Sequence, residues 1–424
     1  MIYEKNQYTP QRLLPDSLST QIISKIKADW YIYLYLLIFS LMKKKDSAKN
    51  TLEKNYSFKV NGYFFVIAMW LLSRLLIIVA MQVVAPLIYT SPVQPYWHPP
   101  YPLGFSPDFI PKPSWELFSH WDGKWYRKIA LEGYNYVDDG NQYSIAFYPL
   151  FPLLIRGLIT FGLPFEVAGT LLSNLTFLGA LLLVYSWTKE RHGIDAAKWV
   201  TAVMAWCPFS LYGTVIYTEG LFLFLTTAAL RAFDNRQYVW AAFCGALASA
   251  TRPTGITLLP TFIFVAWIER RSLSAYIAGL FVAVGILLFS VYCAISFGDP
   301  LAFVHVHKAW AQPSWWYIFT DAILVGKDSL IKIVMVFGGG YLLWHYRTQL
   351  NNVVIIYGFC SLLMLIFSGS LASINRYAYG IVSLSLALGL LFSKQQRWKY
   401  VVFIWFIILL FVYAINFTIW NWVA

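Results

Sequence analysis

The stretch LLSNLTFLGALLLVY, residues 171–185, carries no charged side chain, and similar apolar stretches recur from about residue 60 to the last residue. The chain has 424 residues, of which 59% are hydrophobic and 12% are charged, and its mean hydropathy is +0.57. Soluble domains are about one quarter charged, so this composition indicates an integral membrane protein. Because a segment in lipid must satisfy its own backbone hydrogen bonds, each apolar stretch is expected to be a helix.

Length and hydropathy predict an all-α polytopic membrane protein with about 11 transmembrane helices. These are centred near Arg74, Thr176, Ala205, Phe224, Leu247, Phe262, Gly285, Phe337, Phe359, Leu384 and Ile408. The basic loops all fall on one side, which the positive-inside rule assigns to the cytoplasm. They are residues 43–50, 189–193, 234–237, 269–271, 345–347 and 394–399. The formal charge of +12 is thereby largely explained by membrane orientation, and it gives no support to a nucleic-acid partner.

This arrangement divides the chain into two parts. Residues 1–58 are expected to form a cytoplasmic or interfacial segment, and residues 59–424 the transmembrane domain. With the N-terminus inside, the outer face receives two long segments, about residues 85–166 and 298–328. Long loops on one face of a membrane bundle are where function concentrates, so the candidate site is expected there.

The stretch HWDGKWYRKIALEGY, residues 120–134, places a carboxylate between two tryptophans in the first outer segment. On a helical wheel of residues 115–131, Asp122 falls in the middle of the aromatic face and not among the charges. The pattern predicts an amphipathic helix on the outer membrane surface, and residues 146–158 predict a second one. A carboxylate on an apolar face is costly unless a group outside the helix needs it. The alternative is that the helix starts at Gly123 and Asp122 is only its N-cap.

Four arginines break the positive-inside pattern or lie within apolar helices: Arg74, Arg156, Arg252 and Arg376. An arginine within a membrane is a functional hypothesis by default. Arg252 and Arg376 are expected at the outer face, where a planar guanidinium suits bidentate binding of a lipid phosphate. Arg74 lies nearer the middle of its helix and is expected to face inward. The alternative for each is snorkelling or pairing with a carboxylate such as Glu219.

Other polar residues of the outer face are candidates for substrate binding. Glu219, in VIYTEGLF, lies at an outer turn and is either a substrate hydrogen-bond acceptor or a partner of an arginine. His305 and His307, in FVHVHKAW, suggest a metal site with Asp122, but the spacing specifies no third ligand. The sequence therefore predicts no metal site and no cofactor.

Several segments together resemble, in order, those of the PIG-V family of GPI mannosyltransferases and its prokaryotic relatives. They are HWDGKWYRKIALEGY, LLSNLTFLGALLLVY, CPFSLYGTVIYTEGLFLFLT, GALASATRPTGI and FGDPLAF. The resemblance covers about residues 63–310 and extends more loosely to Arg376. It implies a GT-C fold and the transfer of a mannosyl or other sugar residue, with inversion, from a polyprenyl-phosphate donor. The acceptor would be a lipid, a glycan or a protein on the non-cytoplasmic face.

The resemblance also implies roles for individual residues. Asp122 matches the catalytic aspartate of the first outer loop and would act as general base toward the acceptor hydroxyl. Arg252, Arg376 and Arg74 would bind the donor phosphate and stabilise its developing charge. The residues expected to bind substrate are Trp121, Trp125, Tyr126, Glu219, His305 and His307.

Two further expectations concern location and the alternative function. GPI is a eukaryotic lipid, whereas the short loops of this chain favour a bacterial plasma membrane over the endoplasmic reticulum, which would exclude a GPI acceptor. A membrane transporter or lipid flippase is the alternative, with the arginines lining a path. Such folds usually contain internal repeats, and we find none between the two halves of the sequence.

Overall fold

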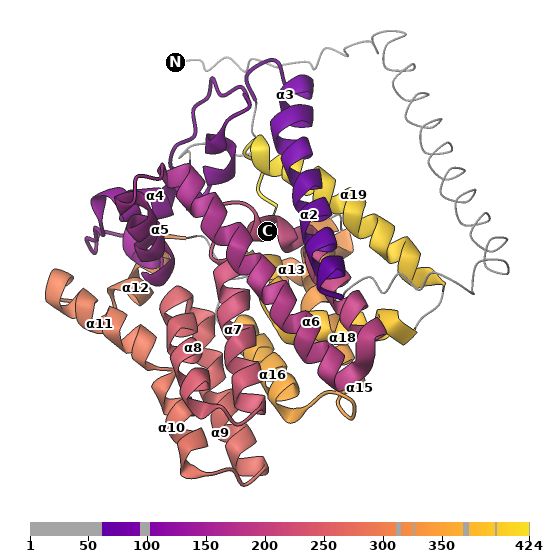
Figure 1. The fold of residues 1–424 in the computed structure, drawn as a ribbon. Coiled ribbons are helices and arrows are strands. Elements are labelled where there is room, and N and C mark those ends of the chain that lie inside the picture. The colour runs from indigo at the N-terminus through magenta and orange to yellow at the C-terminus, as the bar shows by residue number, and fades with distance from the viewer. Residues whose placement is uncertain are drawn as a thin grey trace, which may run out of the picture. The chain divides into compact units, whose positions relative to one another are not determined.

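The computed structural model describes residues 62–93, 102–310, 315–324, 327–367, 373–394 and 397–423. All regular elements in these residues are helical, which confirms the all-α prediction (Figure 1). The chain from Asn61 to Ala424 forms one compact unit. The segment expected at residues 1–58 lies outside the described residues.

The first part of the unit consists of a long helix followed by the short helices of the first outer segment. In chain order these are α2 (Gly62–Val79), the π-helical turn η1 (Ala80–Val84), α3 (Ala85–Ile88), η2 (Trp115–Ser119), α4 (Asp122–Glu132), η3 (Ser144–Ala146) and α5 (Leu150–Thr160). The predicted surface helix of residues 146–158 corresponds to α5. The helix predicted over residues 115–131 is wrong as a continuous element, because the chain breaks between η2 and α4.

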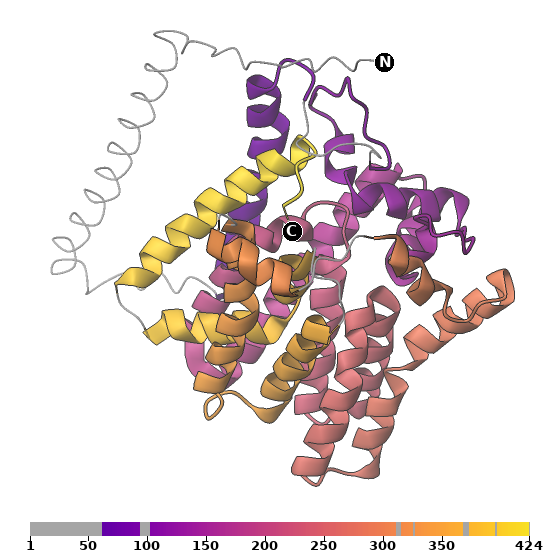
Figure 2. The ribbon, with the colours of Figure 1, turned by 180° about the vertical axis from the view of Figure 1, so that it is seen from behind.

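The rest of the unit is a bundle of helices with short connections (Figures 1 and 2). Its first half contains α6 (Phe165–Trp206), η4 (Pro208–Gly213), α7 (Glu219–Asp234), α8 (Tyr238–Thr251), η5 (Pro253–Thr257), α9 (Leu258–Ile268), α10 (Leu273–Phe281) and α11 (Val284–Phe297). Its second half contains α12 (Ala302–His305), η6 (Val306–Ala309), α13 (Trp315–Leu324), α14 (Lys327–Ile333), η7 (Val334–Gly338), α15 (Gly339–His345), α16 (Asn352–Phe367), α17 (Ile374–Tyr379), α18 (Val382–Lys394) and α19 (Trp398–Thr418).

Helix length and composition bear on the number of membrane spans. Among the described residues, four helical stretches are long and apolar enough to cross a membrane: Gly62–Ile88, Phe165–Trp206, Leu273–Phe297 and Trp398–Thr418. Six shorter apolar helices of 10–17 residues accompany them. The chain is thus a polytopic integral membrane protein, and the count of about 11 spans stays a prediction.

The two spans expected near Thr176 and Ala205 lie in one element, α6, which is interrupted at Gly193. This residue has φ 84° and ψ 176°, outside the helical region and in a conformation that favours glycine. The chain therefore changes direction within the predicted basic loop of residues 189–193, and the helical stretches on either side remain separate.

Basic loops far apart in the sequence are joined by contacts at this end of the bundle. Arg191 Nη2 lies 2.7 Å from Asp234 Oδ2, and Arg231 Nη2 lies 2.6 Å from Glu190 Oε1. At the start of α16, the Asn352 amide donates to Glu269 Oε1 over 2.9 Å. The Arg271 guanidinium also donates to the Phe233 carbonyl, which brings the loops after α7 and α9 to one face, as the positive-inside pattern predicts.

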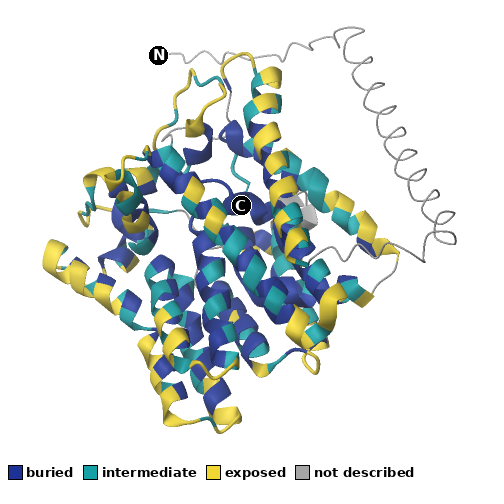
Figure 3. Ribbon diagram, in the orientation of Figure 1, coloured by how far each residue is buried: buried dark blue, intermediate teal, exposed yellow. Residues whose placement is uncertain are grey.

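The centre of the bundle is formed by α6 and α7, and 12 of the 16 residues of α7 are buried (Figure 3). Helix α6 packs against α2, α7 and α18. Helix α7 approaches α6 closely at Gly220, where an added Cβ would lie 2.4 Å from the carbonyl oxygen of Ser173. Only a residue without a side chain fits this position.

We therefore expect Gly220→Ala to lower the free energy of unfolding by about 1–3 kcal/mol, because α7 must move away from α6. Thermal unfolding in detergent micelles measures the effect. Gly157 in α5 provides the matched control, since an added Cβ there meets nothing within 4 Å. Gly157→Ala should stabilise its helix by about 0.5–1 kcal/mol. Equal stability of the two variants would contradict this account of the interface.

Candidate active site

A strained turn places Asp122 at the start of α4. The Gly123 N–H donates to the His120 carbonyl over 3.1 Å, and Trp121 has φ 55° and ψ −119°. These values define a type II′ β-turn with tryptophan at the position that glycine normally occupies. Such a conformation costs about 1–3 kcal/mol and persists only where the surroundings enforce it. Helix α4 therefore begins at Asp122, and Trp121, not Asp122, is its N-cap residue.

The end of the chain holds this turn in place. After α19 the chain turns back toward the body of the bundle (Figure 1), and Trp420 stacks on His120 with ring centroids 4.1 Å apart. The His120 Nδ1–H donates to the Phe417 carbonyl over 3.2 Å. Burial lowers the pKa of His120 to about 3, so the ring is neutral. Trp121 packs against Trp422 at a centroid distance of 4.9 Å.

Asp122 is part of a cluster of two acids and two arginines. Its Oδ2 atom accepts a hydrogen bond from Arg376 Nη1 over 2.5 Å. Glu219 Oε1 lies 2.6 Å from Arg252 Nη1 and 3.1 Å from Arg376 Nε, although neither contact has hydrogen-bond angles. The four charges balance in number. The sequence predicted Asp122, Arg252 and Arg376 as site residues from segments far apart in the chain. The structure brings these three side chains together around Glu219.

Burial makes this cluster unusual and distinguishes its members. The side chain of Glu219 is 0% exposed, Arg252 is 5% and Arg376 is 8%, whereas Asp122 is 18% exposed. Buried charges require partners, and the pairs within the cluster provide them. Asp122 is the member that an incoming molecule can reach most easily.

Aromatic side chains surround the guanidinium of Arg376. Its Cζ atom lies 5.0 Å from the ring centroid of Tyr217 and 5.4 Å from that of Tyr377. The Tyr217 hydroxyl also accepts a hydrogen bond from the Asp122 N–H over 3.2 Å. Burial alone would disfavour the charged form of Arg376, but Asp122 and Glu219 outweigh it and raise its pKa well above the ordinary value. The arginine therefore stays charged within a cage of rings.

Arg252 has a similar environment. Its Cζ atom lies 4.4 Å from the ring centroid of Tyr377, so this ring is near both guanidinium groups. The aromatic neighbours Tyr217 and Tyr377 were not anticipated from the sequence as site residues. Each lies beside a predicted residue, since Tyr217 precedes Glu219 by two positions and Tyr377 follows Arg376 directly.

Arg74 lies outside this cluster. Its guanidinium donates to the Ser210 carbonyl over 2.9 Å, to Ser210 Oγ over 2.9 Å and to the Ala205 carbonyl over 3.2 Å. It also packs over the Phe177 ring at 4.7 Å. These contacts hold α2 against the end of α6 and the start of η4, where helical carbonyl groups lack intrahelical partners.

Two of the predicted substrate-binding aromatics lie further along α4. Trp125 stacks on Phe147 with centroids 5.8 Å apart and also contacts Trp310 at 6.4 Å. Tyr126 is buried and packs edge-on against Phe147 and Phe151. Trp125 therefore connects α4 to the second outer segment, while Tyr126 belongs to the packing beneath the helix.

The two histidines of the second outer segment have different surroundings. His305 Nδ1 lies 2.7 Å from Asp299 Oδ2, and the His307 ring lies 5.8 Å from that of Trp310. Neither is in contact with Asp122 through any interaction of the described residues. Among all the residues that the structure describes, no group of three or more His, Cys, Asp or Glu side chains is arranged to hold a metal ion.

A large apolar cavity adjoins the helices that carry the cluster. It has a volume of about 490 Å³ and is formed by α4, α5, α8 and α11. Ile129 and Tyr134 line it on the side of α4, Ala246 and Ala250 on the side of α8, and Leu288 on the side of α11. Its wall does not include Asp122, Arg252 or Arg376, although α4 begins with the first and α8 ends immediately before the second.

Comparisons with known sequences support the resemblance only over part of the chain. No family model matches the sequence. GPI mannosyltransferase 2 of Cryptococcus neoformans var. neoformans serotype D is 28% identical over 149 residues, which cover 32% of this chain and 34% of that protein. The match thus spans about a third of the length of this curated relative, and it agrees with the resemblance to GPI mannosyltransferases.

A solved structure shares the fold. ArnT from Cupriavidus metallidurans, bound to undecaprenyl phosphate, superposes with a TM-score of 0.50 at 14% identity, over 80% of this chain and 62% of ArnT. The oligosaccharyltransferase of Archaeoglobus fulgidus gives a TM-score of 0.45 at 14% identity, over 83% of this chain and 53% of that one, which is too low to bear on the fold. The chain is therefore an integral membrane protein with the GT-C fold of membrane glycosyltransferases.

Proposed function

We propose that the chain is a glycosyltransferase that moves a sugar from a polyprenyl-phosphate donor to an acceptor hydroxyl on the non-cytoplasmic side of the membrane. The observation that carries the proposal is the pairing of Asp122 with Arg376 in a buried cluster with Glu219 and Arg252. Transfer of a sugar from a lipid phosphate needs a carboxylate that the acceptor can reach, to take its proton, and fixed cations to stabilise the leaving phosphate. The cluster contains one such carboxylate and two such cations. Mannose is the sugar implied by the resemblance to GPI mannosyltransferases.

The proposed reaction is a single displacement. The acceptor hydroxyl loses its proton to the Asp122 carboxylate while its oxygen forms a bond to the anomeric carbon. The bond from that carbon to the phosphate oxygen breaks, and its electron pair leaves with the polyprenyl phosphate. Arg376 and Arg252 stabilise the charge that develops on this leaving group. One base and no covalent intermediate give inversion at the anomeric carbon.

We assign the phosphate-binding role to Arg252 and Arg376 and a structural role to Arg74. All the hydrogen bonds that the structure gives Arg74 go to Ser210 and Ala205, and its guanidinium packs on Phe177. Trp121, Trp125 and Glu219 remain proposed contacts of the substrate or supports of the groups that contact it. His305 and His307 are proposed to contact the acceptor only, because they lie on the second outer segment.

The cavity of about 490 Å³ is proposed to hold the first part of the prenyl chain of the donor. Its lining is mostly aliphatic and aromatic, which suits a hydrocarbon. Ile129 lies seven residues after Asp122 on α4, a rise of about 10 Å, so a chain in the cavity would leave its phosphate near the cluster.

Filling this cavity should weaken use of long-chain donors. We expect Ala246→Phe to raise the KM for a long polyprenyl-phosphate sugar by about tenfold or more, with little change in kcat. A donor with a truncated prenyl chain should be used as well as by the wild type. Val239→Phe, on the same helix at a position that is 81% exposed, is the control. An unchanged KM for the long donor would exclude the cavity as the prenyl site.

The activity itself is tested with purified protein and radiolabelled polyprenyl-phosphate mannose. Total membrane lipids and glycans serve as acceptors, and a labelled nucleotide sugar serves as the control donor. We expect label to enter the acceptor fraction with release of polyprenyl phosphate, and none to come from the nucleotide sugar. Binding of polyprenyl-phosphate sugars without transfer of any sugar would favour the transporter or flippase instead. We also propose that the protein lies in a bacterial plasma membrane with its N-terminus on the cytoplasmic side.

A further inference from the structure

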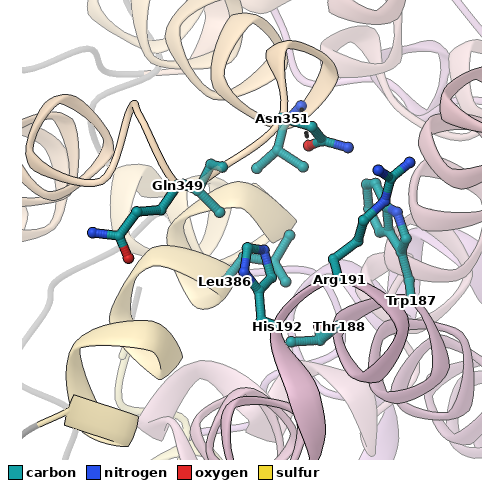
Figure 4. Close-up of a pocket in the computed structure, with 9 residues that line it drawn as sticks. Trp187, Thr188, Arg191, His192, Gln349, Asn351 and Leu386 are labelled. Atoms are coloured by element: carbon teal, nitrogen blue, oxygen red, sulfur yellow. Dashed lines mark hydrogen bonds between the residues drawn. The ribbon is translucent and has the colours of Figure 1, made fainter.

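A second cavity lies far from the charged cluster, at the end of the first helical stretch of α6, just before the break at Gly193. It has a volume of about 230 Å³ and opens among the basic loops. Helix α6 begins beside α4, where Arg127 Nε lies 3.2 Å from Glu166 Oε1. The cavity is reached at Thr188, 22 residues and about 33 Å further along the helix. The turn before α16 and one side of α18 close the cavity (Figure 4).

Two hydrogen-bond donors of this cavity have no partner among the described residues. Thr188 is 2% exposed, and its Oγ1 atom is buried without a hydrogen bond. Asn351 uses its Oδ1 atom to accept the Val354 N–H over 3.3 Å, which leaves its Nδ2 amide buried and unpaired. Buried polar groups are nearly always satisfied, so two orphans in one cavity indicate that a polar ligand or water completes them.

The residues that line the cavity include one cation, Arg191, and no acid. Arg191 lines it and is held by Asp234, whose carboxylate also accepts the Trp187 indole N–H over 3.0 Å. The ring of His192 forms another part of the wall. In Figure 4 the Arg191 guanidinium and the Asn351 amide point toward one another, and the Gln349 amide is turned away. The N-terminus of α16, which begins at residue 352, adds partial positive charge.

We propose that this cavity binds a phosphate group, carried by an anionic phospholipid of the leaflet beside the basic loops or free in solution. The unpaired hydroxyl and amide and the spare N–H groups of Arg191 are donors, and phosphate oxygens are strong acceptors. Basic pockets between helices on the cytoplasmic side are suited to lipid headgroups. Because the cavity lies far from Asp122, this site is independent of the proposed sugar transfer.

Two nearly isosteric variants separate binding from folding. Thr188→Val removes a hydroxyl that makes no hydrogen bond within the described residues, so the unliganded protein should be at least as stable as the wild type. Asn351→Asp keeps the oxygen that caps α16 but replaces the free donor by a negatively charged oxygen. Arg347→Gln is the control, because it removes a cation from the same turn that does not line the cavity.

The test uses the delipidated full-length protein in detergent, with thermal unfolding and native mass spectrometry as readouts. The probes are phosphatidic acid, phosphatidylcholine and inorganic phosphate. We expect phosphatidic acid to bind and raise the Tm of the wild type and of Arg347→Gln. Its binding to Thr188→Val and Asn351→Asp should be weaker by about tenfold or more. Phosphatidylcholine should have little effect.

The three probes also identify the source of the phosphate. Stabilisation by phosphatidic acid alone assigns the site to a lipid headgroup, and equal stabilisation by inorganic phosphate assigns it to a soluble phosphate. The proposal is overturned if neither phosphatidic acid nor inorganic phosphate stabilises the wild type. The cavity would then be filled by water. It is also overturned if both cavity variants bind phosphatidic acid as tightly as Arg347→Gln does.

Discussion

Asp122→Asn is expected to reduce sugar transfer by about 10³-fold or more, since general-base catalysis contributes up to about 10⁴-fold. The amide has almost the same shape as the carboxylate but cannot take the proton of the acceptor hydroxyl. Asp122 is also the least buried member of the cluster, at 18% exposure, so loss of its charge should disturb the fold less than a change at Glu219 would. Initial rates of transfer from a labelled polyprenyl-phosphate sugar measure the effect.

Glu116→Gln is the control for this prediction. Glu116 belongs to the same outer segment and pairs with Lys124 over 2.6 Å, but its side chain is 64% exposed. This variant should retain nearly all activity, because exposed ion pairs contribute little. Both variants should bind the donor. Glu116→Gln should unfold at a temperature close to that of the wild type, and Asp122→Asn should lose less stability than Glu219→Gln. Transfer by Asp122→Asn within a factor of about ten of wild type would remove Asp122 from the role of base.

The sequence alone predicted the membrane fold and singled out all four members of the charged cluster. Hydropathy is a property of local composition, so it identified helices such as α2 and α19 without any knowledge of their neighbours. Asp122, Arg252 and Arg376 were singled out because a charge in an apolar context needs a compensating group. Glu219 was named as one possible partner of the arginines, but only the structure shows that it contacts both Arg252 and Arg376.

Other features depend on contacts between distant residues and could not be predicted locally. The periodicity of residues 115–131 fits one continuous helix, yet the chain turns at Trp121. What enforces that turn is packing against Trp420 and Trp422, about 300 residues later, which no helical wheel contains. For Arg74, the sequence showed a buried cation but not the carbonyl groups of Ser210 and Ala205 that satisfy it.

Glu219→Gln is expected to lower the free energy of unfolding by about 3–5 kcal/mol and to abolish transfer, because it leaves a buried cation without its counter-charge. Glu219 is fully buried and lies within 2.6 Å of Arg252 and 3.1 Å of Arg376. Glu166→Gln provides the comparison, since Glu166 pairs with the half-exposed Arg127 over 3.2 Å. Loss of this surface pair should cost about 0–1 kcal/mol. Thermal unfolding in detergent measures both.

Removing the cation together with the acid separates stability from catalysis. In the double variant Glu219→Leu with Arg252→Met no unpaired charge remains, because Arg376 keeps its hydrogen bond to Asp122. We expect this variant to regain most of the stability that Glu219→Gln loses, since apolar residues can replace a buried ion pair without penalty. Transfer should stay abolished, because one of the two cations that face the leaving phosphate is gone. Restored transfer would show that Arg252 and Glu219 only support the fold, and the phosphate would then depend on Arg376 alone.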